Sequence, residues 1–250
     1  MDGKFVKVKG YEKKIPFIYG IDFLTHDIPL GMLFPSENEE AFAKFFSILK
    51  YCHYPLQIVV SDDANGLVSG LKRVYPKARR QLCQNHYLEI IRQQLKIRTE
   101  KTYHSFFFAL HDVFNGQYHH FKREALLRHL WHTRAKHDAI LEAILVDVLK
   151  RYNELFAYDN KMTHCPRTTN IIESYNSHLN GRLKTIKGFQ SFHSASRWLN
   201  AWMIRRRTKP FMDCDSPFKQ LNGKTSLEMS IKKQAHWPAI LGLQAPKIKR

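Results

Sequence analysis

The stretch that most constrains the fold reads Leu56-Gln57-Ile58-Val59-Val60-Ser61-Asp62-Asp63-Ala64-Asn65-Gly66. Its first half is almost wholly apolar, which is typical of a central strand covered on both faces. We expect the strand to stop at the acidic pair and a helix to follow over residues 66–75. Ligands of open α/β sheets gather beyond the carboxyl ends of the strands, so the sequence predicts a functional site near Asp62.

The segments on either side of this strand complete the predicted architecture. Strand-like runs at residues 5–9, 14–22 and 28–34 are joined by short turns and predict an antiparallel meander, followed by a helix from about Ser36 to His53. A short strand is predicted at residues 81–83. Apolar residues then recur at helical spacing from 85 to 159, and two more helices are predicted over 168–184 and 192–207. The predicted class is therefore α/β, with an all-helical block inserted before the last two helices.

The composition excludes several classes of protein. The chain has 250 residues, of which 44% are hydrophobic, enough for a sizeable core. It contains no apolar run of the roughly twenty residues that a bilayer helix needs, and no apolar signal-peptide segment follows Met1. The four cysteines lack the regular spacing of a disulfide framework, so we expect free thiols and a cytoplasmic location.

Positive charge is concentrated in the last part of the chain. The formal net charge is +18; residues 1–100 carry 15 basic and 11 acidic side chains (+4), and residues 181–250 carry 15 and 3 (+12). Such a field favours a polyanionic partner, although a solvated tail is the alternative. The predicted phosphate contacts are Arg182, Lys184, Lys187, Arg197, Arg205, Arg206 and Arg207, and the alternative for them is a helix face that only confers solubility.

Three carboxylates stand out by their placement. Asp2 lies at the head of the first strand, Asp62 follows the central strand, and Glu173 lies inside a predicted helix. Two divalent ions about 3.5–4 Å apart, held by such ligands, can activate an attacking oxygen and stabilise a leaving one, and oxygen ligands suit Mg²⁺ or Mn²⁺. A structural alternative exists for Glu173, because Asn170 could cap this helix and Glu173 could complete a capping box.

Cys83 and His86 form a Cys-x-x-His pair, which is half of a zinc site. His164 and Cys165 could complete four ligands of the required chemistry. The alternative is a buried thiol beside a hydrogen-bonded histidine close to the active site.

The order of these motifs resembles the catalytic region of the mutator-type DDE transposases of insertion-sequence elements. The resemblance rests on four segments: Asp2-Gly3, residues 59–67, residues 75–86 with the Cys-x-x-His pair, and residues 169–176 followed by Arg182, Lys184 and Gly188-Phe189. Position by position, Asp2, Asp62 and Glu173 match the metal ligands of that family.

The resemblance implies an RNase H-like mixed sheet flanked by helices. Its catalytic core would comprise residues 1–86 and 167–210, with a helical insertion at 87–166 and a basic tail at 211–250. It further implies two Mg²⁺ or Mn²⁺ ions, cleavage of DNA at the terminal inverted repeats of an element, and joining of the ends to target DNA. A homo-oligomer in a prokaryotic cytoplasm, associated with the nucleoid, is expected on the same basis.

Complete members of the family carry a DNA-binding region upstream of the first catalytic aspartate, and we expect this chain to lack it. Two alternatives to an active transposase follow. One is a truncated, inactive remnant that only binds DNA, and the other is an RNase H-like nuclease that hydrolyses strands without joining them.

Overall fold

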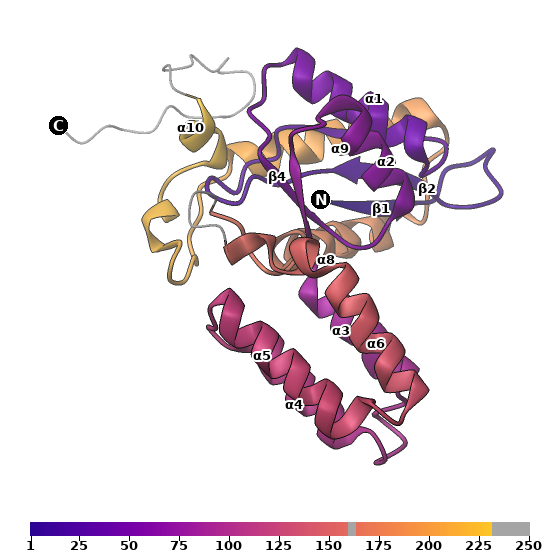
Figure 1. The fold of residues 1–250 in the computed structure, drawn as a ribbon. Helices are drawn as coiled ribbons and strands as arrows, with labels where there is room; N and C mark the ends of the chain where they lie inside the picture. Colours follow the sequence, from indigo (N-terminus) through magenta and orange to yellow (C-terminus); the bar gives the residue numbers. More distant parts are fainter. Residues whose placement is uncertain (160–163, 232–250) are drawn as a thin grey trace. The chain divides into compact units, whose positions relative to one another are not determined.

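The structure is a computed structural model that describes residues 1–159 and 164–231 (Figure 1). The chain forms two compact units, Met1–His53 with Ile171–Arg250, and Tyr54–Asn170. The described strands form one sheet in each unit, and helices make up most of the rest. The predicted α/β class is therefore confirmed.

The first unit is built on a three-stranded antiparallel meander. Its strands are β1 (Asp2–Val6), β2 (Ile15–Tyr19) and β3 (Gly31–Leu33), in that order. In this register Asp2 lies opposite Tyr19, and Tyr19 lies opposite Gly31. Every residue of β2 is buried, so the middle strand has both faces covered. The predicted meander is confirmed.

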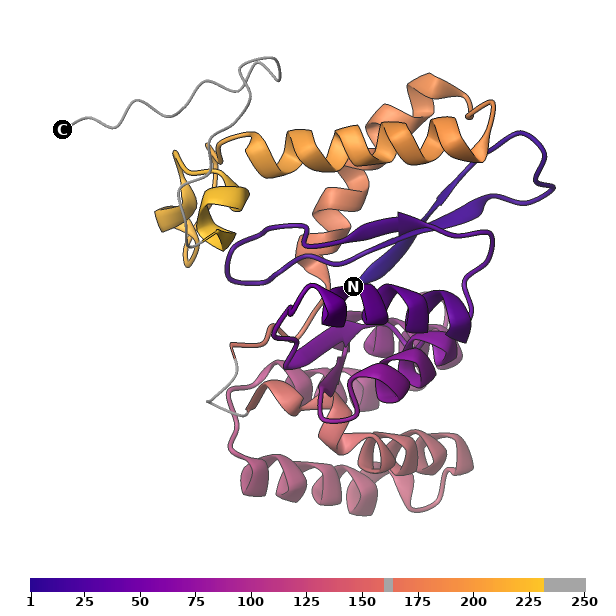
Figure 2. The same ribbon diagram turned by 90° about the horizontal axis from the view of Figure 1, so that it is seen from above.

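Helices cover both faces of this sheet. Figure 2 shows α8 (Asn170–Ile186) and α9 (Phe192–Thr208) on one side and α1 (Glu39–Tyr51) on the other. α1 begins after Asn38, whose side chain accepts a hydrogen bond from the Ala41 amide, as a helix cap requires. The chain then continues through a 3₁₀ turn, η3 (Lys219–Leu221), and α10 (Ser226–Ser230).

The core of the first unit explains two features of its sequence. Trp202 of α9 makes edge-to-face contacts with Phe17 and Tyr19 of β2, with ring centroids 6.3 and 5.9 Å apart. α9 also passes so close to β3 that a Cβ on Gly31 would lie 2.5 Å from the sulfur of Met203. A side chain at position 31 would therefore force Met203 and Phe17 to shift.

The second unit begins with a β-α-β element. β4 (Ile58–Ser61) pairs in parallel with β5 (Arg79–Leu82), and α2 (Asn65–Val74) connects them. Burial alternates along β4, where Val59 and Ser61 are buried and Ile58 and Val60 are only half-buried. The expectation that this strand is fully covered on both faces was therefore wrong, because one side of it is only partly covered.

The rest of the second unit is helical, as predicted. It consists of α3 (Gln84–Gln94), α4 (His104–Asn115), α5 (His120–Leu130), the π-helical turn η1 (Trp131–Ala135), α6 (Ala139–Lys150), α7 (Tyr152–Leu155) and the 3₁₀ turn η2 (Ala157–Asp159). Arg123 is fully buried among these helices, where it pairs with Asp159 and stacks 4.1 Å over the ring of Phe156. β4, α2 and β5 group with the helices that were predicted as an insertion at 87–166.

Two further observations concern the predicted tail and membrane association. Residues 211–231 contain η3 and α10, whereas the remainder of the predicted tail lies outside the described residues. None of the described helices combines the length and the apolar character that crossing a bilayer requires.

Candidate catalytic carboxylates

The first unit links Asp2 and Glu173 through the end of its sheet. Asp2 is the first residue of β1, and its register partner is Tyr19. The Tyr19 hydroxyl donates a 2.7 Å hydrogen bond to Oδ1 of Asn176, which lies on α8 three residues after Glu173. Since residues three apart on a helix occupy neighbouring positions on one face, the turn with Glu173 is fastened to the end of the ladder where Asp2 lies.

The other end of α8 is fastened to the end of the same strand. The Phe189 amide donates to the Lys7 carbonyl and the Lys9 amide donates to the Phe189 carbonyl, both at 2.8 Å. Gly188 adopts a φ of +133°, and a Cβ there would meet the carbonyl of Lys7 at 3.4 Å. The Gly188-Phe189 pair of the resembled motif is therefore an anchor that holds α8 on β1.

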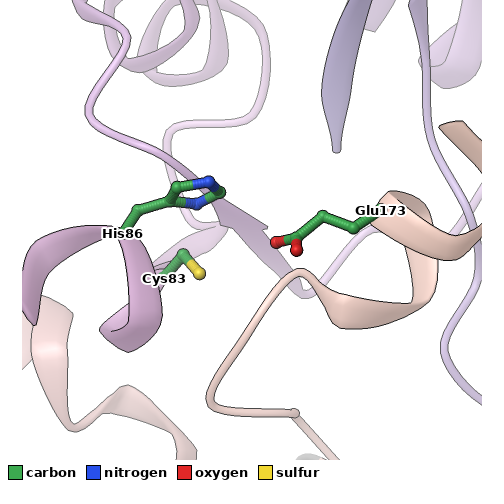
Figure 3. A group of neighbouring side chains, drawn as sticks. All are labelled: Cys83, His86 and Glu173. Carbon is green, nitrogen blue, oxygen red and sulfur yellow. The ribbon is translucent and has the colours of Figure 1, made fainter. Parts of the chain in front are cut away.

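Glu173 is an exposed residue in the first turn of α8, beside the buried Ile172 and Tyr175. Figure 3 shows its side chain extending from the helix. α8 begins at Asn170, within one residue of the position that the capping-box explanation of Glu173 requires, and that explanation stays an alternative prediction.

The second unit distinguishes the two aspartates that follow β4. Both are exposed, but Asp63 lies between the guanidinium groups of Arg80 and Arg151. Burial by itself raises the pKa of Asp63. The hydrogen bonds and charges of the two arginines together lower the pKa by more than burial raises it, so the net shift is downward. No described side chain pairs with the carboxylate of Asp62. Asp62 is thus the member of the pair that is available to a ligand.

Cys83 and His86 lie at the start of α3 (Figure 3). Cys83 is fully buried, and its sulfur accepts hydrogen bonds from the amide and the hydroxyl of Thr169 at 3.4 and 3.2 Å. The same hydroxyl lies 3.5 Å from Nδ1 of His86. These contacts are those of a buried thiol beside a hydrogen-bonded histidine.

The four-ligand zinc alternative is not supported. His164 and Cys165 do not join Cys83 and His86 in a cluster of metal-ligating atoms among the described residues. Burial raises the pKa of the Cys165 thiol to about 12.

The predicted phosphate contacts fall into two groups. Two of them are engaged within the first unit, because Arg207 makes a bidentate pair with the buried Asp27, with both distances 2.8 Å, and Arg206 stacks 4.3 Å over the ring of Tyr175. Five are exposed on or beside α8 and α9: Arg182, Lys184, Lys187, Arg197 and Arg205. Five of the seven predicted phosphate contacts are thus exposed, and two are engaged by partners within the protein.

Sequence reasoning missed the residues that hold the candidate site in place. Arg80 contacts Glu154, which lies 74 positions away, and Arg151 contacts Asp63 across 88 positions. Tyr19 and Asn176 are separated by 157 positions. No local spacing pattern marks such pairs, and only the fold brings them together.

Comparison with known proteins identifies the family of the chain. The family model described as Transposase, Mutator family, matches residues 22–209. The chain therefore belongs to the Mutator family of transposases. Asp62 and Glu173 lie within the matched range, and Asp2 precedes it.

The chain is similar to two curated transposases of the insertion sequence element IS256 in transposon Tn4001, from Staphylococcus aureus and Enterococcus faecalis. Each is 27% identical over 180 residues, which covers 69% of this chain and 44% of the relative. The chain thus spans less than half the length of these relatives.

Proposed function

We propose that this chain is the catalytic part of a DDE transposase with an RNase H-like core, in which Asp2, Asp62 and Glu173 hold two Mg²⁺ or Mn²⁺ ions. The observation that carries the proposal is the carboxylate of Asp62, which is exposed at the carboxyl end of β4 while its neighbour Asp63 is committed to two arginines.

The donor set suits the proposed ions. All three side chains offer carboxylate oxygens, which Mg²⁺ and Mn²⁺ prefer to nitrogen or sulfur. Ions bound there would activate the oxygen that attacks a phosphodiester and neutralise charge on the oxygen that leaves. The task of the protein is to hold these carboxylates in place, and on α8 the Tyr19–Asn176 and Phe189–Lys7 hydrogen bonds serve that purpose.

The substrate is proposed to be the terminal inverted repeats of an element, together with target DNA. The five exposed cations of α8, α9 and the segment between them would contact phosphates, which fixes the position of a duplex without reading its sequence. Because the two ends of an element must be processed together, we expect the active form to be a homo-oligomer.

The direct test uses labelled duplexes that end in the terminal repeats of the element. The chain, and a version extended upstream, are incubated with Mg²⁺ or Mn²⁺, and cleaved and joined products are separated. Asp62→Asn and Glu173→Gln should lower the rate at least about 100-fold, as expected for loss of a metal ligand. Asp112→Asn and Glu142→Gln, which alter exposed helical acids outside the proposed site, are the matched controls and should retain the wild-type rate.

A second measurement does not depend on turnover. Fe²⁺ with ascorbate and peroxide cuts a polypeptide next to the residues that bind the ion. We expect cuts near positions 62 and 173 that excess Mn²⁺ suppresses and that Asp62→Asn abolishes.

The products separate the alternatives. Joined strands exclude a nuclease that only hydrolyses. DNA binding that is equal with and without the carboxylates, with no metal-dependent cutting in either version, would overturn the proposal in favour of an inactive DNA-binding remnant.

A further inference from the structure

The loop after β4 is held by a chain of alternating charges that lies entirely within the second unit. Its centre is Arg80 of β5, whose side chain is only 7% exposed. One nitrogen, Nη2, donates to the Asp62 carbonyl at 2.7 Å and to Oδ1 of Asp63 at 3.0 Å. The other, Nη1, donates to Oε2 of Glu154 at 2.9 Å. A single guanidinium thus connects the Asp62–Asp63 loop to α7.

A second arginine extends the chain to α6. Arg151, at the end of that helix, binds the other carboxylate oxygen of Asp63. Its Nε also donates to Oδ1 of Asp147 at 3.1 Å. Oδ2 of Asp147 accepts a hydrogen bond from the hydroxyl of Tyr87 on α3 at 2.7 Å. The loop is therefore connected to three helices of the helical block.

This arrangement differs from an ordinary surface ion pair. Exposed pairs contribute little, because solvent screens them and both side chains lose freedom. Here the guanidinium of Arg80 is almost buried and its two Nη atoms satisfy three acceptors at once, and such multidentate charged hydrogen bonds fix geometry as well as charge. One of the three acceptors is the backbone carbonyl of Asp62, so Arg80 directly restrains the backbone of the proposed metal ligand.

We propose that Arg80 and Arg151 are positioning residues for Asp62, and that the helical block, through Arg151 and Glu154, holds the loop that presents this carboxylate. The inference rests on the proposed function of Asp62 as a metal ligand. It also gives Asp63 a distinct role: this side chain is the anchor of the loop, and Asp62 is the ligand.

The test compares Asp63→Asn, Arg151→Gln and the double variant. Both side chains are about one third exposed, at 33% and 32%, so these variants should fold. Arg80→Lys keeps the charge, but a compact ammonium group cannot reach acceptors that Arg80 contacts from two separate nitrogens. Arg128→Gln, which breaks an exposed 3.8 Å pair with Glu124 in the same unit, is the matched control.

Two readouts are needed. Hydrogen exchange of residues 61–66 in the metal-free protein reports the loop alone, and it should accelerate about 10-fold in the four test variants but not in the control. The Mn²⁺ concentration that half-saturates DNA cleavage should rise about 10- to 100-fold, as for other groups that orient metal ligands. The effect of the double variant should be smaller than the sum of the two single effects, because both substitutions remove the Asp63–Arg151 contact.

The inference is overturned if loop exchange and the Mn²⁺ requirement match those of Arg128→Gln, or if the two single effects add in the double variant. Failure of the proposed function would be recognised separately, because then either no version would cleave DNA or Asp62→Asn would leave cleavage and the iron-directed cut at position 62 intact.

Discussion

Arg205 and Arg207, two positions apart at the end of α9, should differ in what the same substitution impairs: DNA binding in one case and stability in the other. Arg207 pairs through two 2.8 Å hydrogen bonds with Asp27, whose side chain is 3% exposed, and Ser226 donates to the same carboxylate at 3.2 Å. Arg205 is exposed, two residues earlier. Arg207→Gln should therefore destabilise the first unit, whereas Arg205→Gln should weaken DNA binding.

The size of the stability loss expected for Arg207→Gln follows from the burial of Asp27. Breaking a buried ion pair typically costs about 3–5 kcal/mol, because the remaining charge stays desolvated. The side chain of Arg207 is itself 29% exposed, so solvent reduces the loss, and we expect about 2–3 kcal/mol. At 1.4 kcal/mol for each factor of ten, this corresponds to roughly 30- to 100-fold faster exchange of the slowest amides in β2 and α9. Arg205→Gln should change stability by less than about 0.5 kcal/mol.

Salt titration of duplex DNA binding supplies the second half of the comparison. Each phosphate contact contributes about 0.9 to the slope of log K against log salt, so Arg205→Gln should lower that slope by about 1 and Arg207→Gln should leave it unchanged. The reasoning is refuted if Arg207→Gln lowers the slope at unaltered exchange rates, because Arg207 would then be a phosphate contact and its pairing with Asp27 incidental.

Three further predictions concern single contacts. Gly31→Ala should destabilise the protein by about 1–3 kcal/mol in urea unfolding, since its Cβ would clash with the buried ring of Phe17 and with Met203. Gly181→Ala, in open space on a helix, should instead stabilise the protein by up to about 1 kcal/mol, and equal effects would contradict the packing of α9 on β3. The pKa of Asp63 in the folded state lies below its ordinary value of 3.8, so the stability contributed by its ion pairs should be complete above pH 3.8 and should disappear as the pH falls through the folded-state pKa. A difference in urea midpoint between the wild type and Asp63→Asn that persists in strong acid would contradict this prediction. Thr169→Val should remove a hydrogen bond to Cys83 that contributes about 1 kcal/mol, and hydrogen exchange at the start of α8 should become about fivefold faster. Thr169→Ser keeps the hydroxyl and should exchange at the wild-type rate; a serine variant that behaves like the valine variant would exclude the hydroxyl as the cause.

The sequence predicted the elements of the fold well because their signals are local. Apolar periodicity located the meander, α1, the helical block, α8 and α9 to within a few residues. The error at β4 had a physical reason, since a short apolar run indicates a buried strand but does not report how many faces are covered. The grouping of β4, α2 and β5 with the helical block depends on contacts between distant residues and had no local signal.

The candidate site was predictable only at the level of residue type and order. The acidic pair after β4 was recognisable, and the family resemblance favoured Asp62, but nothing in the sequence separates two adjacent aspartates physically. The separation comes from Arg80 and Arg151, which are 17 and 88 residues from Asp63 in the chain. In the same way, the basic run at the end of α9 gave no indication that Arg207 is paired with Asp27.

Both cases follow one physical rule. A charged side chain that must act on a ligand cannot also be saturated by the protein, yet the segment that carries it must be held still. Asp63 and Arg207 hold their segments still, because each is fixed by ion pairs with partners that are far away in the chain. Asp62 and Arg205 are instead left exposed on the segments that these two residues anchor. Asp63 and Arg207 are therefore interpreted as anchors, and substituting Asp62 together with Asp63, or Arg205 together with Arg207, would conceal the difference that single substitutions reveal.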